Sequence, residues 1–68
     1  MQIRFMGSRR VIFEDEGGVE ILEYDTDTVH VGAGGKRVRL FGSGFSLGKI
    51  TPEIVMVCGD IHSLEFDE

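Results

Sequence analysis

TVHVGAGGKRVRLF, residues 28–41, is the stretch of sequence that decides the fold. Two runs of alternating apolar and polar residues flank a glycine pair, and alternation with a period of two is typical of a β-strand with one buried face. Gly34-Gly35 supplies the positive φ angles that a two-residue hairpin turn requires. The stretch therefore predicts an antiparallel hairpin.

Similar alternation recurs in both directions along the chain, and no segment of ten or more residues has the period of a helix. Gly, Asp, Ser and Thr residues separate the runs and supply turn signals. Residues 53–58 are apolar on both faces, which is typical of a strand inside a sandwich or against a partner. Further strands are predicted over residues 9–14, 19–24, 45–50 and 61–66.

These strands predict an all-β fold, an antiparallel meander that forms a small β-sandwich or a partly open barrel of about seven short strands. Residues 1–68 are expected to form a single domain. Residues 2–6 are interpreted either as an extended segment or as part of a loosely ordered N-terminal extension over residues 1–8. The aromatic residues are expected to fill the core, with one or two at an interface: Phe13, Tyr24, Phe41, Phe45 and Phe66.

The small size of the domain limits its core. A domain of this length buries only about 60% of the surface of its unfolded chain, so it needs tight packing, a staple or a partner subunit. Cys58 is the single cysteine and cannot form a disulfide within the chain, and no Cys/His set has zinc-site spacing. Good packing or association into a homo-oligomer, such as a homodimer, is therefore expected.

The charge balance is acidic. Twelve Asp and Glu residues against seven Lys and Arg residues give a formal net charge of −5. This balance argues against nucleic acid as a partner, because nucleic-acid binding depends on clustered basic residues. Lys36, Arg37 and Arg39 alternate with apolar residues, so they are expected to form the solvated face of a strand; the alternative is a weak anion-binding patch.

The lone cysteine and the lack of an apolar leader favour a cytoplasmic location. No run approaches the roughly 20 apolar residues of a membrane-spanning helix, so direct membrane insertion is not expected. Association with a membrane through a partner remains open.

Residues 42–49, GSGFSLGK, have the composition of a phosphate-binding loop but not its register. A Walker loop needs glycine at the position of Ser43 and Ser or Thr at the position of Ile50. The dinucleotide fingerprint needs glycine at the position of Leu47. The glycines are therefore expected to form bends in a β-sheet, and no cofactor is predicted.

Two polar groups are candidates for metal binding. Residues 25–28 could begin a calcium loop, but His30 and Lys36 stand where that loop needs glycine and glutamate. Asp60 and His62 would share one face of a strand, although the sequence implies no third ligand. Turns and solvent-facing polar residues are the preferred interpretation, and no metal site is predicted.

Nucleophilic catalysis would need Cys58 or a serine activated by a base. Cys58 lies in an apolar run and is expected to be a buried hydrophobe, which His62 could approach only through a bend at Gly59. No catalytic residue is predicted, and the protein is not expected to be an enzyme. The alternative is a small-ligand or metal-binding domain, or less readily an enzyme, that uses His30, Asp60, His62 and Cys58 in a pocket gathering at least three of them.

Three segments carry motifs of a known family. Residues 18–25, GVEILEYD, match the pattern Gly-Val-x-x-(Val/Leu)-x-(Phe/Tyr)-Asp. Residues 38–47, VRLFGSGFSL, match a hydrophobic-x-hydrophobic-x-Gly strand end followed by a short strand. Residues 55–66, VMVCGDIHSLEF, end in the pattern Gly-x-Ile-x-Ser-(Leu/Ile)-x-(Tyr/Phe). In this order and spacing, the segments resemble the YabP/YqfC family of sporulation proteins over most of residues 9–67.

The resemblance implies a protein of endospore-forming Firmicutes that is made in the mother cell during sporulation and acts in spore assembly. It implies a protein partner, such as a membrane protein of the forespore envelope, and a location in the mother-cell cytoplasm or peripherally at the forespore membrane. It provides no catalytic residues, and Gly18, Gly42 and Gly59 match the family as structural positions only. The turns at residues 32–35 and 50–52 depart from the family pattern, which argues against binding through these loops.

The expected function is therefore a non-catalytic interaction or scaffold module of spore assembly. Such a module would bind through exposed strand edges or an apolar sheet face, because edge pairing needs only main-chain hydrogen bonds and no special side chains.

Overall fold

The computed structural model describes residues 1–67, and Glu68, the last residue of the predicted domain, lies outside the described residues. Residues 1–67 form six β-strands and no helix, which confirms the all-β prediction. The strands form one antiparallel sheet in the order β1-β2-β6-β5-β4-β3. Their bounds are β1 Gln2–Phe5, β2 Arg10–Glu14, β3 Glu20–Tyr24, β4 Thr28–Ala33, β5 Lys36–Ile50 and β6 Ile54–Asp67.

The predicted hairpin is formed by β4 and the first part of β5. Val31 lies opposite Val38, and Val29 lies opposite Leu40. Gly34 and Gly35 have φ angles of 59° and 77°. Positive φ at both central residues is the requirement of a type I′ turn, whose twist matches that of the strands it joins.

The last two strands are longer than the sequence predicts. Alternation predicts separate strands over residues 36–41 and 45–50 and over residues 53–58 and 61–66, but each pair is one continuous strand, β5 or β6. The register between β5 and β6 shifts at three places. A β-bulge bends a strand without ending it. The expected strand ends at the glycines are therefore bends within β5 and β6.

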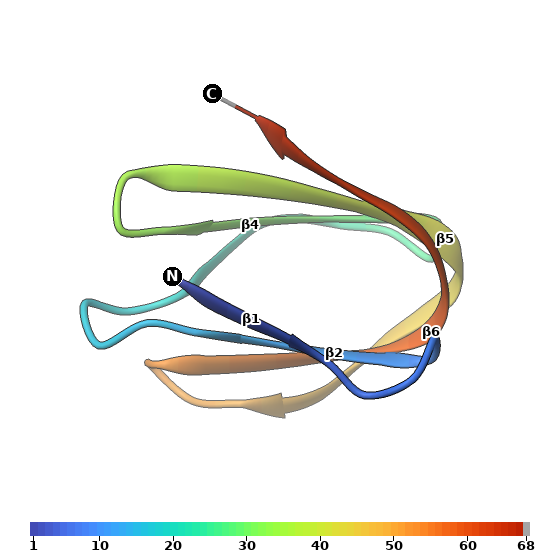
Figure 1. Ribbon diagram of the computed structural model, residues 1–68, viewed down its shortest axis with the longest axis horizontal. Coiled ribbons are helices and arrows are strands. Elements are labelled where there is room, and N and C mark those ends of the chain that lie inside the picture. The colour runs from blue at the N-terminus through green and yellow to red at the C-terminus, as the bar shows by residue number, and fades with distance from the viewer. Residues whose placement is uncertain (68) are drawn as a thin grey trace.

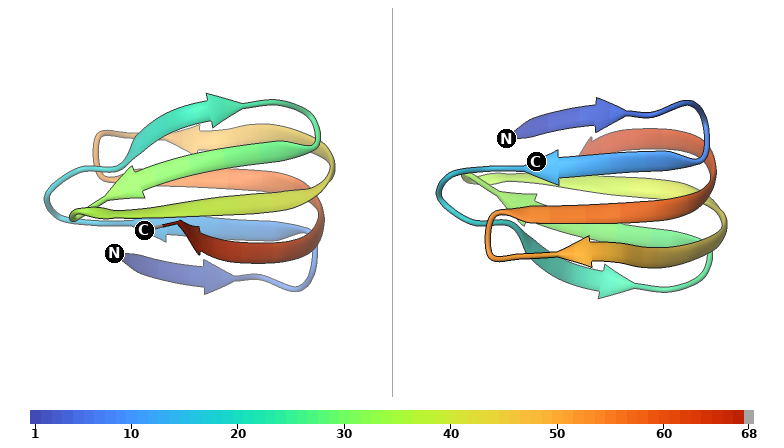
Figure 2. Two further views of the ribbon diagram at one scale, coloured as in Figure 1. Left: turned by 90° about the horizontal axis from the view of Figure 1, so that it is seen from above. Right: turned by 90° about the horizontal axis from the view of Figure 1, so that it is seen from below.

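These bends fold the single sheet into two layers (Figure 1). The upper layer of Figure 1 contains β3, β4, the first half of β5 and the second half of β6 (Figure 2, left). The lower layer contains β1, β2, the first half of β6 and the second half of β5 (Figure 2, right). The result is a small sandwich in which β5 and β6 belong to both layers.

β1 is paired along its whole length with β2. Ile3 lies opposite Phe13, and Phe5 lies opposite Val11. Residues 2–5 thus belong to the sheet. The extended-segment interpretation is correct for them, and the interpretation as a loosely ordered extension is wrong.

The core lies between the two layers. Because side chains alternate along a strand, each inner face receives every second residue. Valine predominates there, as expected for β-branched residues on a pleated surface. Full burial of a side chain of this size contributes about 1.5–3 kcal/mol. The core residues are Val11, Phe13, Val29, Val31, Val38, Leu40, Phe45, Val55 and Val57.

The aromatic residues fill the core less completely than predicted, since three of the five named residues lie outside it. Phe13 and Phe45 are buried, but Phe41 is half-buried and Tyr24 and Phe66 are exposed. Tyr24 lies in β3 and Phe66 in the second half of β6, the outermost strands of the upper layer. A side chain at such an edge points inward but lacks neighbours on one side, so it stays exposed.

Gly42 and Gly59 lie where β5 and β6 bend against each other. A Cβ at Gly42 would overlap the carbonyl oxygen of Asp60, and a Cβ at Gly59 would lie 2.8 Å from Cδ1 of Phe45. Gly59 also has a φ of 143°, which side-chain-bearing residues rarely adopt. Gly18, with a φ of 107°, lies in the turn before β3.

Candidate functional site

A row of polar side chains, most of them charged, crosses the outer face of the upper layer. Glu23 lies opposite His30, His30 opposite Arg39, and Arg39 opposite Glu65 on four neighbouring strands. The Arg39 guanidinium is 3.6 Å from the Glu23 carboxylate and 3.8 Å from that of Asp67. Arg39 and Glu65 are directly opposed, and opposite charges at such positions contribute about 0.2–1 kcal/mol. We call these five residues the outer charge row.

His30 is buried within this row, with 7% of its surface exposed, so its prediction as a solvent-facing residue is wrong. The Arg39 guanidinium lies 3.4 Å from Nδ1 of His30, and Oδ2 of Asp67 lies 3.4 Å from Nε2. Arginine can only donate hydrogen bonds, so a bond between the two requires Nδ1 to accept, which in the neutral ring places the proton on Nε2. His30 is thus a central structural member of the outer charge row.

The basic residues of β5 do not form one patch. Lys36 lies opposite Ala33 and Arg37 opposite Gly32, so the two side chains belong to opposite faces of the hairpin. Arg39 shares the face of Arg37 but is engaged with the acidic residues of the outer charge row. The residues of the alternative anion patch are therefore divided between two faces, and Arg39 is partly neutralised.

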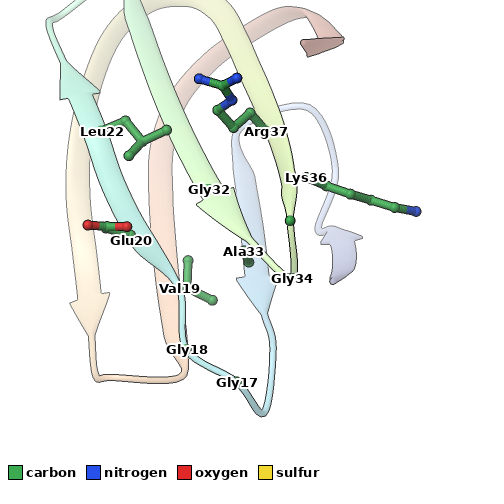
Figure 3. Close-up of a pocket in the computed structure, with 11 residues that line it drawn as sticks. Gly17, Gly18, Val19, Glu20, Leu22, Gly32, Ala33, Gly34, Lys36 and Arg37 are labelled. Atoms are coloured by element: carbon green, nitrogen blue, oxygen red, sulfur yellow. The ribbon is translucent and has the colours of Figure 1, made fainter. Parts of the chain in front are cut away.

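A groove of about 500 Å³ lies where the turn between β2 and β3 meets the β4–β5 hairpin (Figure 3). Gly32 lies at its floor, where a Cβ would lie 3.2 Å from Cδ1 of Leu22 and 3.8 Å from Cγ of Arg37. Glu20, Lys36 and Arg37 line the groove, and in Figure 3 the side chains of Glu20 and Lys36 point to opposite sides. Charges of both signs at its rim give the groove no clear preference for anions.

The sequence places Asp60 and His62 on one face of a strand and predicts no metal site there. Both are exposed, and Asp60 forms an ion pair with Arg9. His62 lies where the register between β5 and β6 shifts. That irregularity interrupts the alternation on which the prediction of one shared face depended.

Cys58 lies in the lower layer, opposite Arg10 of β2 and Ser46 of β5. Its thiol is free and half-buried. It lies on the outer face beside Gly48, and a Cβ added at Gly48 would be 3.5 Å from Sγ of Cys58. The expectation that Cys58 is a buried hydrophobe is therefore wrong.

The residues of the ligand-binding alternative are thus distributed over the molecule. His30 lies on the outer face of the upper layer, whereas Cys58 lies on the outer face of the lower layer. None of His30, Asp60, His62 and Cys58 lines the groove at Gly32. Within residues 1–67, no three His, Cys, Asp or Glu side chains are arranged to hold a metal ion.

The second half of β6 is an uncovered strand edge. β2 lies beside β6 only at residues 54–58, and the backbone of Ser8 and Arg9 accepts from Ile61 and Gly59 just beyond. In the part of the chain that the structure describes, residues 62–67 of β6 have a strand partner on the β5 side alone. Phe66 is 61% exposed, although Val38 directly opposite is fully buried.

β1 is the outermost strand of the lower layer on the same side of the sandwich (Figure 2). Its apolar side chains face inward, because Ile3 and Phe5 lie opposite buried residues of β2. Ile3 is partly buried against the core, whereas Phe5 is 50% exposed. We call the edge formed by β1 and residues 62–67 the β1–β6 side.

The opposite side of the sandwich, where β3 and the second half of β5 are outermost, is closed. The Tyr24 hydroxyl donates a 2.8 Å hydrogen bond to the carbonyl of Phe45, and the Phe45 amide donates to the carbonyl of Thr26 at 2.8 Å. The register of β3 shifts around Leu22, and Lys49 is exposed near the end of β5. Bulges and charged residues are common devices that keep strand edges from pairing.

Sequence reasoning missed the β1–β6 side as a surface. One signal was present, since residues 2–5, QIRF, alternate polar and apolar residues as a strand with one buried face does. The exposure of Phe5 and Phe66 had no local signal, because it depends on where each layer ends.

Comparisons of the chain with protein-family models, with curated proteins and with solved structures give no significant match. Within residues 1–67 there is no helix with the length and apolar character needed to cross a membrane.

Proposed function

We propose that the protein is a non-catalytic interaction module that binds its partner through the β1–β6 side. The observation that carries this proposal is the uncovered edge of β6, where Phe66 is 61% exposed although it lies on the face of the core. An edge strand offers unpaired N–H and C=O groups to an incoming strand, and neighbouring apolar side chains add specificity.

The distribution of the polar candidates supports a non-catalytic role. Catalysis by general acids, bases or nucleophiles requires groups within hydrogen-bond reach of one another. Cys58 and His30 lie on the outer faces of different layers, and Asp60 is engaged with Arg9.

The biological setting is proposed from the sequence resemblance. The likeness of residues 9–67 to the YabP/YqfC family supports a role in spore assembly in the mother cell, with a partner at the forespore membrane. Edge pairing suits such a role, because assembly proteins join surfaces and need no reactive side chains.

Affinity capture from sporulating cells of an endospore-forming host tests the proposal. The tagged protein is compared with Phe66→Glu, which places a carboxylate on the uncovered edge. Ile50→Glu is the matched control, since Ile50 is 56% exposed on the closed side of the sandwich. Partners should be lost with Phe66→Glu and kept with Ile50→Glu. Equal capture by both variants, or no Phe66-dependent partner and no self-association, contradicts the proposal.

A further inference from the structure

We infer that the β1–β6 side binds a second copy of this chain, with β1 of each copy beside the second half of β6 of the other. The inference rests on the proposed function and names the partner of that same surface. It follows from the strand directions, the faces of the side chains and the order of charges along the two edges.

The strand directions suit a two-fold dimer. β1 and the second half of β6 run in opposite directions (Figure 1) and lie in different layers on one side of the sandwich (Figure 2). A two-fold axis parallel to the strands exchanges the two layers between copies and preserves strand direction. It therefore places β1 of one copy antiparallel to β6 of the other and joins the layers into continuous sheets.

The inner faces match in this arrangement. Leu64 and Phe66 lie opposite Leu40 and Val38 and so point toward the core. Ile3 and Phe5 lie opposite Phe13 and Val11 of the other layer and also point toward the core. After the two-fold rotation, the inner face of β6 in the second copy points the same way as the inner face of β1 in the first copy. These apolar residues therefore meet where the two strands lie side by side.

The charges select one register. When Glu65 lies opposite Arg4 of the second copy, Leu64 lies opposite Phe5, and Phe66 lies opposite Ile3. Arg4 and Glu65 are both on outer faces, since they lie opposite Ile12 and Arg39. Aromatic–aliphatic pairs and opposite-charge pairs at directly opposed positions both stabilise a sheet. By symmetry the same set of pairs forms twice.

The charges also extend existing interactions. The Arg4 guanidinium is 3.3 Å from the Glu14 carboxylate, and Glu65 lies opposite Arg39. Pairing Arg4 with Glu65 of the second copy therefore creates an alternating series, Glu14, Arg4, Glu65 and Arg39, that joins the outer charge row across the two copies.

The alternative two-fold arrangement joins like edges and matches less well. The register that places Leu64 opposite Phe66 of a second copy sets Glu65 against Glu65. The register that places Ile3 opposite Phe5 sets Arg4 against Arg4. Like charges directly opposite each other destabilise a sheet, so charge complementarity favours joining β1 to β6.

Disulfide trapping tests the arrangement with single-cysteine variants in a Cys58→Ser background. Arg4→Cys and Glu65→Cys are made in separate chains, mixed at high micromolar concentration and oxidised with glutathione disulfide. Directly opposed strand residues have Cα separations within the range that a disulfide spans. The mixed dimer also keeps one Arg4–Glu65 pair, whereas a homodimer of either variant has none.

The expected result is predominantly mixed disulfide dimer, because only in that dimer do two cysteines lie opposite each other, and the retained charge pair favours it by up to about fivefold more. Predominant Glu65→Cys or Arg4→Cys homodimers would overturn the inference in favour of like-edge pairing. Sedimentation of the unmodified protein provides a second measurement. A dimer that dissociates at least about tenfold more readily with Phe66→Glu, but not with Ile50→Glu, is expected.

A protein that stays monomeric at all concentrations overturns the inference. If capture of a different partner still depends on Phe66 in that case, the proposed function stands and only the second copy is wrong. If neither self-association nor capture depends on Phe66, both fail.

Discussion

The hydroxyl of Tyr24 donates a hydrogen bond of 2.8 Å to the carbonyl oxygen of Phe45, which joins the edge of the upper layer to the bend of β5. We expect Tyr24→Phe to lower the free energy of unfolding by about 1 kcal/mol, the typical net value of one hydrogen bond. Urea denaturation followed by circular dichroism measures the change. An unaltered midpoint would mean that the bond does not stabilise the closed side.

Gly42→Ala is expected to be strongly destabilising, because a Cβ would overlap the carbonyl oxygen of Asp60 and lie 2.5 Å from Cζ of Phe45. The backbone of β5 or β6 must move, and we expect a loss of about 3 kcal/mol or more. Gly48→Ala is the matched control within β5: its Cβ would meet the flexible Met56 side chain at 3.1 Å, so the loss should stay below about 1 kcal/mol. Thermal unfolding measures the stability that each variant loses. Equal losses would contradict the expected clash at Gly42.

The hairpin turn makes a prediction about Gly34, whose φ is 59°. Asn tolerates this conformation and is favoured with a following glycine in type I′ turns, so Gly34→Asn should change stability by less than about 1 kcal/mol. Gly34→Val should cost more than about 1 kcal/mol, because β-branched residues are strained there. Melting temperatures of both variants measure the difference, and equal values would contradict a type I′ turn.

His30 should carry its ring proton on Nε2, because Nδ1 accepts from Arg39 at 3.4 Å. Long-range ¹⁵N–¹H NMR distinguishes the two tautomers directly. Arg39→Leu removes the donor, and we expect a mixture of tautomers in that variant. Arg37→Leu is the control, since Arg37 lies on the same face opposite Gly32 rather than His30. A proton on Nδ1 in the unmodified protein would contradict the described geometry.

The hairpin of residues 28–41 could be predicted because its information is local: alternation defines the strands and two glycines define the turn. The continuity of β5 and β6 could not, because Gly42-Ser43-Gly44 gives the same local signal for a strand end and for a bulge. The distinction depends on packing against Asp60, which is eighteen residues away in the chain, and against Phe45, which lies beyond the bend.

The candidate site was less predictable than the fold for a similar reason. His30 has a polar side chain on an outer face, yet it is buried by contacts with Arg39 and Asp67 from neighbouring strands. Phe66 has an inward orientation, yet it is exposed because its layer ends there. Burial in a small sandwich depends on the neighbouring strands as much as on the direction of a side chain.

The sharing of β5 and β6 by both layers has a consequence for the order of folding. Their pairing starts at the short connection of residues 51–53 and can proceed residue by residue to Arg37 and Asp67. By contrast, the contact of Val11 with Val57 closes a long loop, and loop closure slows folding. A long hairpin that forms early would thus serve as the template on which β1 and β2 dock from one side and β4 and β3 from the other.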